Sequence, residues 1–243
     1  MAVHSQEEKT ENIALPIAIH LRRTVFLSSL TTAACLFGGM LAALSFAIAI
    51  SNLPMHVPEQ TINLFAVGLL VGILFVSGAL WGRTLARIFA SDNKRRMVWA
   101  GALSFAPALV LAGLMLAALE RAIVERGQGP DLPVHQVFTL LFVPASLLVA
   151  ATGGLALGLA EKNVRLALRM AAYGGVSAAI AFLLVDLLMD ALGRRVGAPG
   201  AAERATMLTV MMAGNLAAAL AGGGALGYQL SRYFQRIRVN LGH

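Results

Sequence analysis

Charged residues are scarce in this chain, and their scarcity excludes an ordinary soluble fold. Only 13% of the 243 residues are Asp, Glu, Lys or Arg, whereas a soluble domain carries about 25%. Hydrophobic residues make up 58% of the sequence, and the mean hydropathy is +0.76. The composition therefore indicates an integral membrane protein.

Cysteine is also nearly absent, because Cys35 is the only one in the chain. A disulfide within the chain is therefore excluded. The thiol lies inside an apolar run, and we interpret it as a small buried hydrophobic group.

Recognisable catalytic and cofactor-binding motifs are missing. The chain has no P-loop, no glycine-rich dinucleotide fingerprint, no His-Glu-x-x-His and no serine nucleophile elbow. His56 and His135 lack acidic or cysteine partners at ligand spacing, and a convincing metal site needs three or four ligands. We therefore expect a protein without catalytic activity, cofactor or bound metal.

What the chain does contain is six long apolar runs. An α-helix needs roughly 20 residues to cross the hydrocarbon core of a bilayer, and none of these runs alternates with polar residues as a barrel strand would. Helices also satisfy every backbone group within lipid. The sequence thus predicts an all-α membrane protein with six transmembrane helices. The runs cover residues 24–50, 62–81, 97–119, 137–159, 170–192 and 206–228.

Basic residues, which give the chain a net charge of +7, cluster beside the apolar runs. Of the 19 Lys and Arg residues, 14 lie in the two tails and in the second and fourth connections between runs. The positive-inside rule then places both termini in the cytoplasm. We interpret the clusters as orientation signals and as contacts with anionic lipid headgroups, not with nucleic acid. The Ala-, Gly-, Leu- and Arg-rich composition suits a bacterial inner membrane.

An internal repeat of about 73 residues is marked by arginines that open alternate apolar runs. Arg23, Arg96 and Arg169 are each 73 residues apart, and we expect all three to contact anionic lipid headgroups. The repeat predicts three tandem helical hairpins with pseudo-three-fold symmetry about an axis along the membrane normal. The chain then divides into a polar tail with a short interfacial segment, residues 1–22, and hairpins over 23–95, 96–168 and 169–243.

Each predicted hairpin ends its second apolar run with two glycines four residues apart. Glycines at this spacing share one helix face and allow another backbone to approach closely. We expect these pairs to pack helices at the cytoplasmic end, and we favour this role over gating. The pairs are Gly78 and Gly82, Gly154 and Gly158, and Gly223 and Gly227.

Two polar residues inside apolar runs break the repeat and are the candidate binding residues. Asp186 lies about six residues from the outer end of the fifth run, roughly 9 Å below the interface. It either binds a proton or cation, or pairs locally with Asp190 and Arg194 on the same helix face. Asn215 lies near the middle of the sixth run. We favour a hydrogen bond between helices over a contact with a ligand as its role.

The sequence leaves two classes of function open. The first is a non-catalytic subunit or scaffold that packs against other membrane proteins or against itself, which we prefer because buried charge is scarce and small residues abound. The second is a transporter or channel for a small or lipophilic solute, with proton coupling through Asp186. A transporter requires a polar midplane cavity reached by Asp186 and Asn215, whereas a scaffold requires a dry interior. An enzyme embedded in the membrane ranks third.

Overall fold

The computed structural model describes four long stretches of the chain and is helical wherever a regular element is described. These stretches are residues 20–39, 59–125, 134–196 and 201–240, together with residues 41, 42, 45 and 49. An N-terminal helix occupies residues 20–39. Five further helices follow: α2 Glu59–Ile88, α3 Lys94–Glu125, α4 Val134–Ala160, α5 Val164–Val196 and α6 Ala201–Asn240.

Helices α2 to α6 are longer than the apolar runs that predict them. They contain between 27 and 40 residues, which corresponds to roughly 40–60 Å at 1.5 Å per residue. The helices α3 and α4 continue through Pro107 and Pro144. The fold is a bundle of six helices, and α2 to α6 extend past their apolar segments at both ends.

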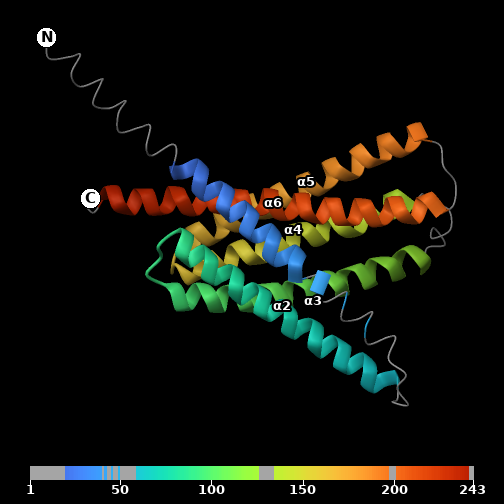
Figure 1. Ribbon diagram of the computed structural model, residues 1–243, viewed down its shortest axis with the longest axis horizontal. Coiled ribbons are helices and arrows are strands. Elements are labelled where there is room, and N and C mark those ends of the chain that lie inside the picture. Colours follow the sequence, from blue (N-terminus) through green and yellow to red (C-terminus); the bar gives the residue numbers. More distant parts are fainter. Residues whose placement is uncertain are drawn as a thin grey trace, which may run out of the picture.

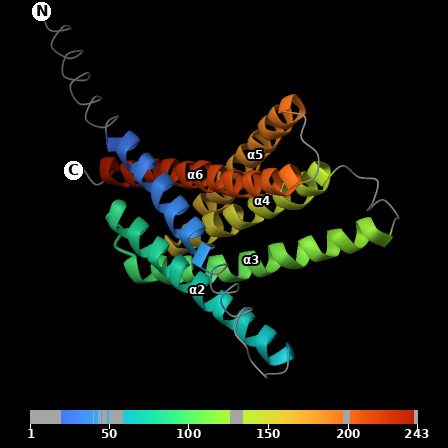
Figure 2. The ribbon, with the colours of Figure 1, turned by 45° about the vertical axis from the view of Figure 1, so that its right-hand side comes forward.

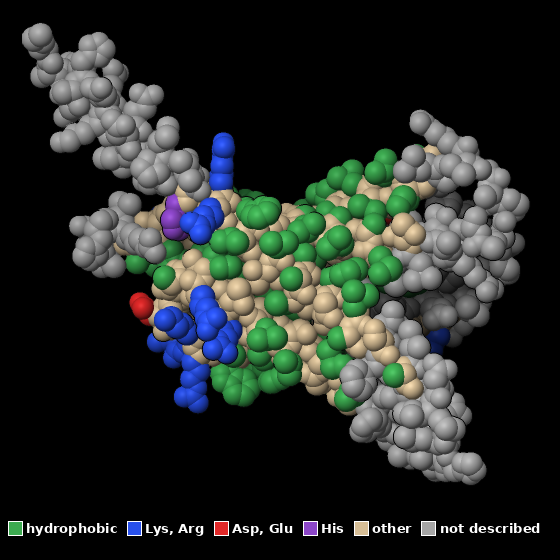
Figure 3. Space-filling view, in the orientation of Figure 1, with side chains coloured by type: hydrophobic (Ala, Val, Ile, Leu, Met, Phe, Trp, Pro, Cys, Tyr) green, Lys and Arg blue, Asp and Glu red, His purple; other side chains and the backbone are tan. Residues whose placement is uncertain are grey.

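Three of the helices contain segments long and apolar enough to cross a membrane among the residues that the structure describes. These segments are Val67–Ile88, Leu140–Ala160 and Val164–Met189, of 21 to 26 residues each. Large hydrophobic side chains are also exposed along the outside of the bundle, as at Val76 and Leu168. In Figure 3 such side chains cover the middle of the visible surface, whereas Lys and Arg gather at one end. A multi-pass membrane protein accounts for this distribution.

Each of the helices α2 to α5 packs against the next one in the chain. The N-terminal helix packs against α2 and α6. Helices α2 to α6 are in contact pairwise in chain order. The indole Nε1 of Trp81 in α2 donates to Thr32 Oγ1 of the N-terminal helix at 2.8 Å. The hydroxyl of Ser28 donates to the carbonyl of Gly223 in α6 at 2.9 Å. The helices lie close together where α2 turns into α3, and α2 and α5 spread apart toward the opposite end (Figures 1 and 2).

The three glycine pairs lie where helices approach most closely. A Cβ atom at Gly82 would lie 2.1 Å from the carbonyl oxygen of Met97 in α3. At Gly158 it would lie 2.2 Å from the Cα atom of Ala167 in α5. The other members of the pairs are similarly crowded: Gly78 by Gly101, Gly154 by Met170, Gly223 by Thr32 and Gly227 by Ser28. Each pair therefore packs on the helix that opens the following predicted hairpin, and the third pair packs on the N-terminal helix.

Two short turns at the crowded end have the same backbone geometry. Ala90 after α2 and Lys162 after α4 have positive φ angles of 49° and 56°. In both turns this residue donates to the carbonyl three residues earlier, and the next residue donates to the carbonyl five residues earlier, which is a Schellman motif. Asn163 then caps α5, because its Oδ1 accepts from the N–H of Leu166 at 2.9 Å. The hydrogen bonds join Ala90 to Arg87, Ser91 to Ala86, Lys162 to Leu159 and Asn163 to Gly158.

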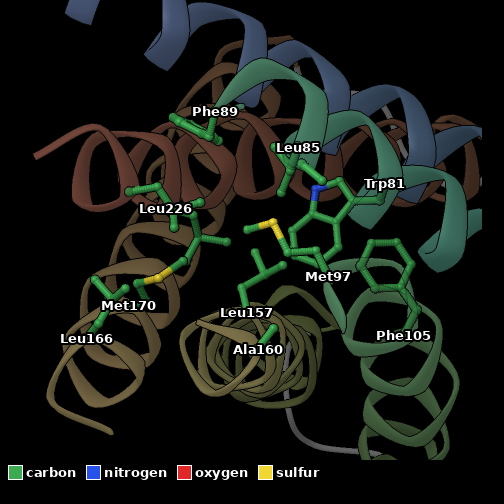
Figure 4. Packing of buried hydrophobic residues seen from close by; sticks show 12 residues of the cluster. Trp81, Leu85, Phe89, Met97, Phe105, Leu157, Ala160, Leu166, Met170 and Leu226 are labelled. Atoms are coloured by element: carbon green, nitrogen blue, oxygen red, sulfur yellow. The ribbon is translucent and has the colours of Figure 1, made fainter. Parts of the chain in front are cut away.

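The main hydrophobic core lies beside these turns. Met97 of α3 points toward Trp81 of α2 and Leu157 of α4 (Figure 4), and all three side chains are almost fully buried. The rings of Trp81 and Phe105 lie 5.0 Å apart between centroids. Leu226 of α6 joins the same cluster. Leu166 and Met170 of α5 belong to it too, so the core holds α2 to α6 together at the end where the glycine pairs pack.

Candidate functional site

A cavity of about 180 Å³ lies between the helices, and its wall includes residues from all six. Eight of the lining residues are Ala or Gly, and larger lining residues include Trp81, Phe105, Phe142 and Leu226. An apolar cavity of about 150 Å³ is large enough to bind benzene. The small lining residues are Ala145, Ala150, Gly153, Ala178, Ala218, Ala219, Gly222 and Gly223.

The small residues on this wall differ in effect from the glycine pairs at the crowded end. At Gly82 and Gly158, the backbone of the neighbouring helix occupies the space that a side chain would fill. At Gly222 the nearest atoms to an added Cβ lie 3.4 Å away, and they include the Cβ atoms of Ala150 and Ala178. These alanines are too short to fill the centre of the bundle. The space that they leave is the cavity, and protein interiors contain few such voids.

Three polar side chains reach the cavity wall: Thr32, Ser146 and Asn215. The hydroxyl of Thr32 accepts from Trp81 and donates to the carbonyl of Ser28 at 2.8 Å. Ser146 donates to the carbonyl of Val143 at 2.9 Å. Both hydroxyl protons are thus bonded to helix backbone. Asn215 supplies the only amide side chain among the described lining residues.

The two candidate binding residues from the sequence occupy different places. Asn215 lines the cavity, whereas Asp186 is absent from the described lining residues. Asp186 is buried, with 5% of its surface exposed. A Cβ atom at Gly214 would lie 2.7 Å from the ring of Phe182, so these two residues mark the contact between α5 and α6. Asp186 lies one helical turn beyond Phe182, roughly 6 Å further along α5.

A buried carboxylate that sequence reasoning missed joins the two short turns. Glu161 is only 8% exposed. Its Oε1 accepts from the hydroxyl of Ser91 at 2.6 Å, and its Oε2 accepts from Nδ2 of Asn93 at 3.1 Å. The backbone N–H of Asn93 also donates to the Ser91 hydroxyl, at 3.0 Å. This network fastens the α2–α3 turn to the α4–α5 turn. In the sequence, Glu161 is one acid within a short charged connection, and nothing there marks it as buried.

The three arginines that mark the repeat are exposed on the outside of the bundle. Arg23, Arg96 and Arg169 each lie near the start of a helix, and these three helices start at the crowded end of the bundle (Figure 1). About one turn after each arginine is an exposed aromatic side chain, and these are Phe26, Trp99 and Tyr173. Aromatic residues beside basic ones are typical of the membrane–water interface.

Neither a search for metal-ligand groups nor a comparison with known proteins adds an indication of function. Within the part of the chain that the structure describes, no group of three or more His, Cys, Asp or Glu side chains could hold a metal ion. His56 lies outside the described residues. Comparison with protein-family models, with curated proteins and with solved structures finds no match to this chain.

Proposed function

We propose that this chain is a non-catalytic membrane protein that binds a small lipophilic molecule in the cavity between its helices. The observation that carries the proposal is the cavity itself, whose wall is built from Ala and Gly where larger side chains would close it. Buried apolar surface supplies the binding free energy, and Asn215 supplies one polar contact that orients the ligand.

The proposal includes six membrane spans, arranged as three hairpins, with both termini in the cytoplasm of a bacterium. The arginines and aromatic residues that lie together at one end support a cytoplasmic interface there. The pseudo-three-fold arrangement is supported by the glycine pairs, since each packs on the helix that opens the next hairpin.

Proton coupling is not part of this proposal. A coupling carboxylate must exchange its proton with the bound solute or with the solute pathway. Asp186 is buried within the α5–α6 region but does not line the cavity. We therefore propose binding, and passage where it occurs, of an uncharged solute.

A second candidate function is a subunit or scaffold that packs against other membrane proteins or a second copy of itself. A separate glycine pair, Gly68 and Gly72 on α2, supports it. Both glycines are exposed, and no described atom lies within 4 Å of an added Cβ at either. Val67 and Val76 beside them are exposed as well. Native mass spectrometry of the protein from its own membrane tests this candidate: a defined larger assembly supports it, and a lone monomer excludes it.

The lipophile proposal is tested through the fluorescence of Trp81, which lines the cavity. In a Trp99→Phe background Trp81 is the only tryptophan. Bromobenzene, a small apolar quencher, is titrated into the purified protein in detergent. Saturable quenching of Trp81 is expected, beyond the linear quenching that comes from partitioning into the micelle.

Two matched substitutions on α5 make this test specific. Ala178 lines the cavity and Ala172 is exposed on the same helix. Ala178→Leu places an isobutyl group in the cavity and should abolish the saturable phase. Ala172→Leu adds the same group to the outside and should leave it unchanged. Quenching that is linear in all variants, or equally saturable in all, would refute the proposal.

A further inference from the structure

A second concave site lies at the basic end of the bundle, between the start of α5 and the last turns of α6. It is a recess of about 280 Å³, lined by four arginines together with polar side chains. Arg165 and Arg169 are four residues apart on α5, and Arg232 and Arg236 are four residues apart on α6. Residues at this spacing share one helix face, so two pairs of guanidinium groups border the same space.

The described wall of this recess carries positive charge without an acidic neighbour. No acidic side chain is among the described residues that line it. Like charges in one recess repel each other, and more strongly where protein excludes part of the solvent. The first turn of α5 also contains no acid, although the positive end of a helix dipole favours negative charge there. Arg165 therefore adds positive charge where the helix itself disfavours it.

Neighbouring groups restrain the side chains around the recess. Asn163, which lines it, is held as the N-cap of α5. Arg232 donates through Nη1 to the hydroxyl of Tyr228 at 3.2 Å, and its guanidinium lies 5.5 Å from the centre of that ring. Tyr233, also on the wall, packs edge-on against Phe234. A restrained wall lowers the entropy that a ligand must overcome on binding.

We propose that this recess binds a phosphate group. Guanidinium groups match phosphate oxygens with paired, charge-assisted hydrogen bonds, which lysine cannot reproduce. Four arginines supply enough positive charge for a phosphate monoester or a diphosphate, and Gln229 and Tyr233 offer further hydrogen bonds. The phosphate belongs either to an anionic lipid headgroup or to a soluble phosphate compound, and the same contacts recognise both. This site is separate from the apolar cavity and does not depend on it.

The test uses two double variants that remove the same charge at the same spacing. Arg165→Gln with Arg169→Gln alters the recess. Arg83→Gln with Arg87→Gln alters an exposed pair on α2 that lies outside the recess. Binding of pyrophosphate is measured by calorimetry in a neutral detergent. Binding of phosphatidylglycerol, against phosphatidylcholine, is measured by native mass spectrometry of the delipidated protein.

The native chain should bind at least one of these probes saturably. The recess variant should lose about tenfold or more in affinity, and the α2 variant less than about twofold. Binding of pyrophosphate assigns the site to soluble phosphates, and binding of phosphatidylglycerol alone assigns it to lipid. Equal losses in the two double variants, or no saturable binding of either probe to the native chain, would overturn the proposal.

A charge-preserving variant covers the case in which the recess variant fails to fold. Arg169→Lys with Arg232→Lys keeps the net charge but removes the paired hydrogen bonds of two guanidinium groups. It should weaken binding several-fold while the protein elutes and unfolds as the native chain does. Unchanged affinity in this variant would show that the arginines act only as diffuse charge, and would also overturn the proposal.

Discussion

The contact of Gly82 with α3 gives the sharpest prediction, because α2 also contains a matched control position. Gly82 and Gly72 lie on the same helix, ten residues apart. A Cβ at Gly82 would lie 2.1 Å from the carbonyl oxygen of Met97, whereas no described atom lies within 4 Å of a Cβ at Gly72. Gly82→Ala and Gly72→Ala are thus the same chemical change in a filled and an open environment.

The expected energies follow from this geometry. The carbonyl of Met97 belongs to the backbone of α3, which cannot rotate aside, so the two helices must separate by about 1 Å to admit the new methyl group. Overpacking of this kind costs about 1–3 kcal/mol. Gly72→Ala meets no clash and gains up to about 1 kcal/mol of helix propensity. The two variants should therefore differ by about 1–4 kcal/mol, or roughly 2–16 °C in unfolding midpoint.

Labelling of the Cys35 thiol measures the unfolding midpoint. It is the only cysteine, and it packs in part against the main core. A maleimide dye that fluoresces on reaction will label it as the protein unfolds during a thermal ramp in detergent. Gly82→Ala should lower the midpoint, and Gly72→Ala should leave it unchanged or raise it slightly. Equal midpoints for the two variants would show that the glycine pair does not determine how closely α2 and α3 pack.

Three further predictions use the same thermal assay or the quenching titration. Glu161→Gln turns one acceptor of the turn network into a donor and should cost about 1–3 kcal/mol, whereas Asp92→Asn, at an exposed neighbour, should cost less than about 0.5 kcal/mol. Trp81→Phe removes a buried hydrogen bond and part of the core, and should destabilise by about 1–3 kcal/mol, whereas Trp99→Phe, at a side chain 51% exposed, should not. Asp186→Asn should leave bromobenzene affinity within about twofold, because the side chain lies off the cavity wall; a loss of tenfold would restore a ligand role to this acid.

Local patterns in the sequence predicted the helices well. Apolar runs predict where a helix forms because burial and backbone hydrogen bonding within lipid are local requirements. The structure extends α2 to α6 past their runs, and α6, for example, continues to Asn240. Charged residues such as Arg232 and Arg236 ended the predicted run near residue 228, yet they are good helix formers.

Contacts between helices were less accessible to sequence reasoning. The spacing of Gly78 and Gly82 predicts a face that admits another helix, but it does not name the helix. That partner depends on how the turn after Ile88 returns the chain, which Ala90 achieves with a positive φ angle that its residue type does not favour. For the same reason the burial of Glu161 could not be predicted, since its partners lie in a turn 70 residues earlier.

The sequence singles out polar residues for the candidate site, but it does not show which of them line the cavity. Asn215 and Asp186 both stood out as polar residues in apolar runs, but depth in the membrane does not determine the direction of a side chain around the helix. Successive residues are rotated by about 100° around the helix axis. The direction of a side chain around the helix therefore determines whether the residue lines the cavity. The cavity is space that alanines leave unfilled, and no pattern of residue types along one helix reveals it.

The contact between the N-terminal helix and α6 has a consequence for biogenesis. Ser28 and Thr32 leave the ribosome well before the glycines that cover them, Gly223 and Gly227. Until α6 is made, the N-terminal helix lacks this partner. A chain that stops before α6 leaves this polar face open to lipid or to a quality-control protease. The bundle therefore closes only after α6 has been synthesised.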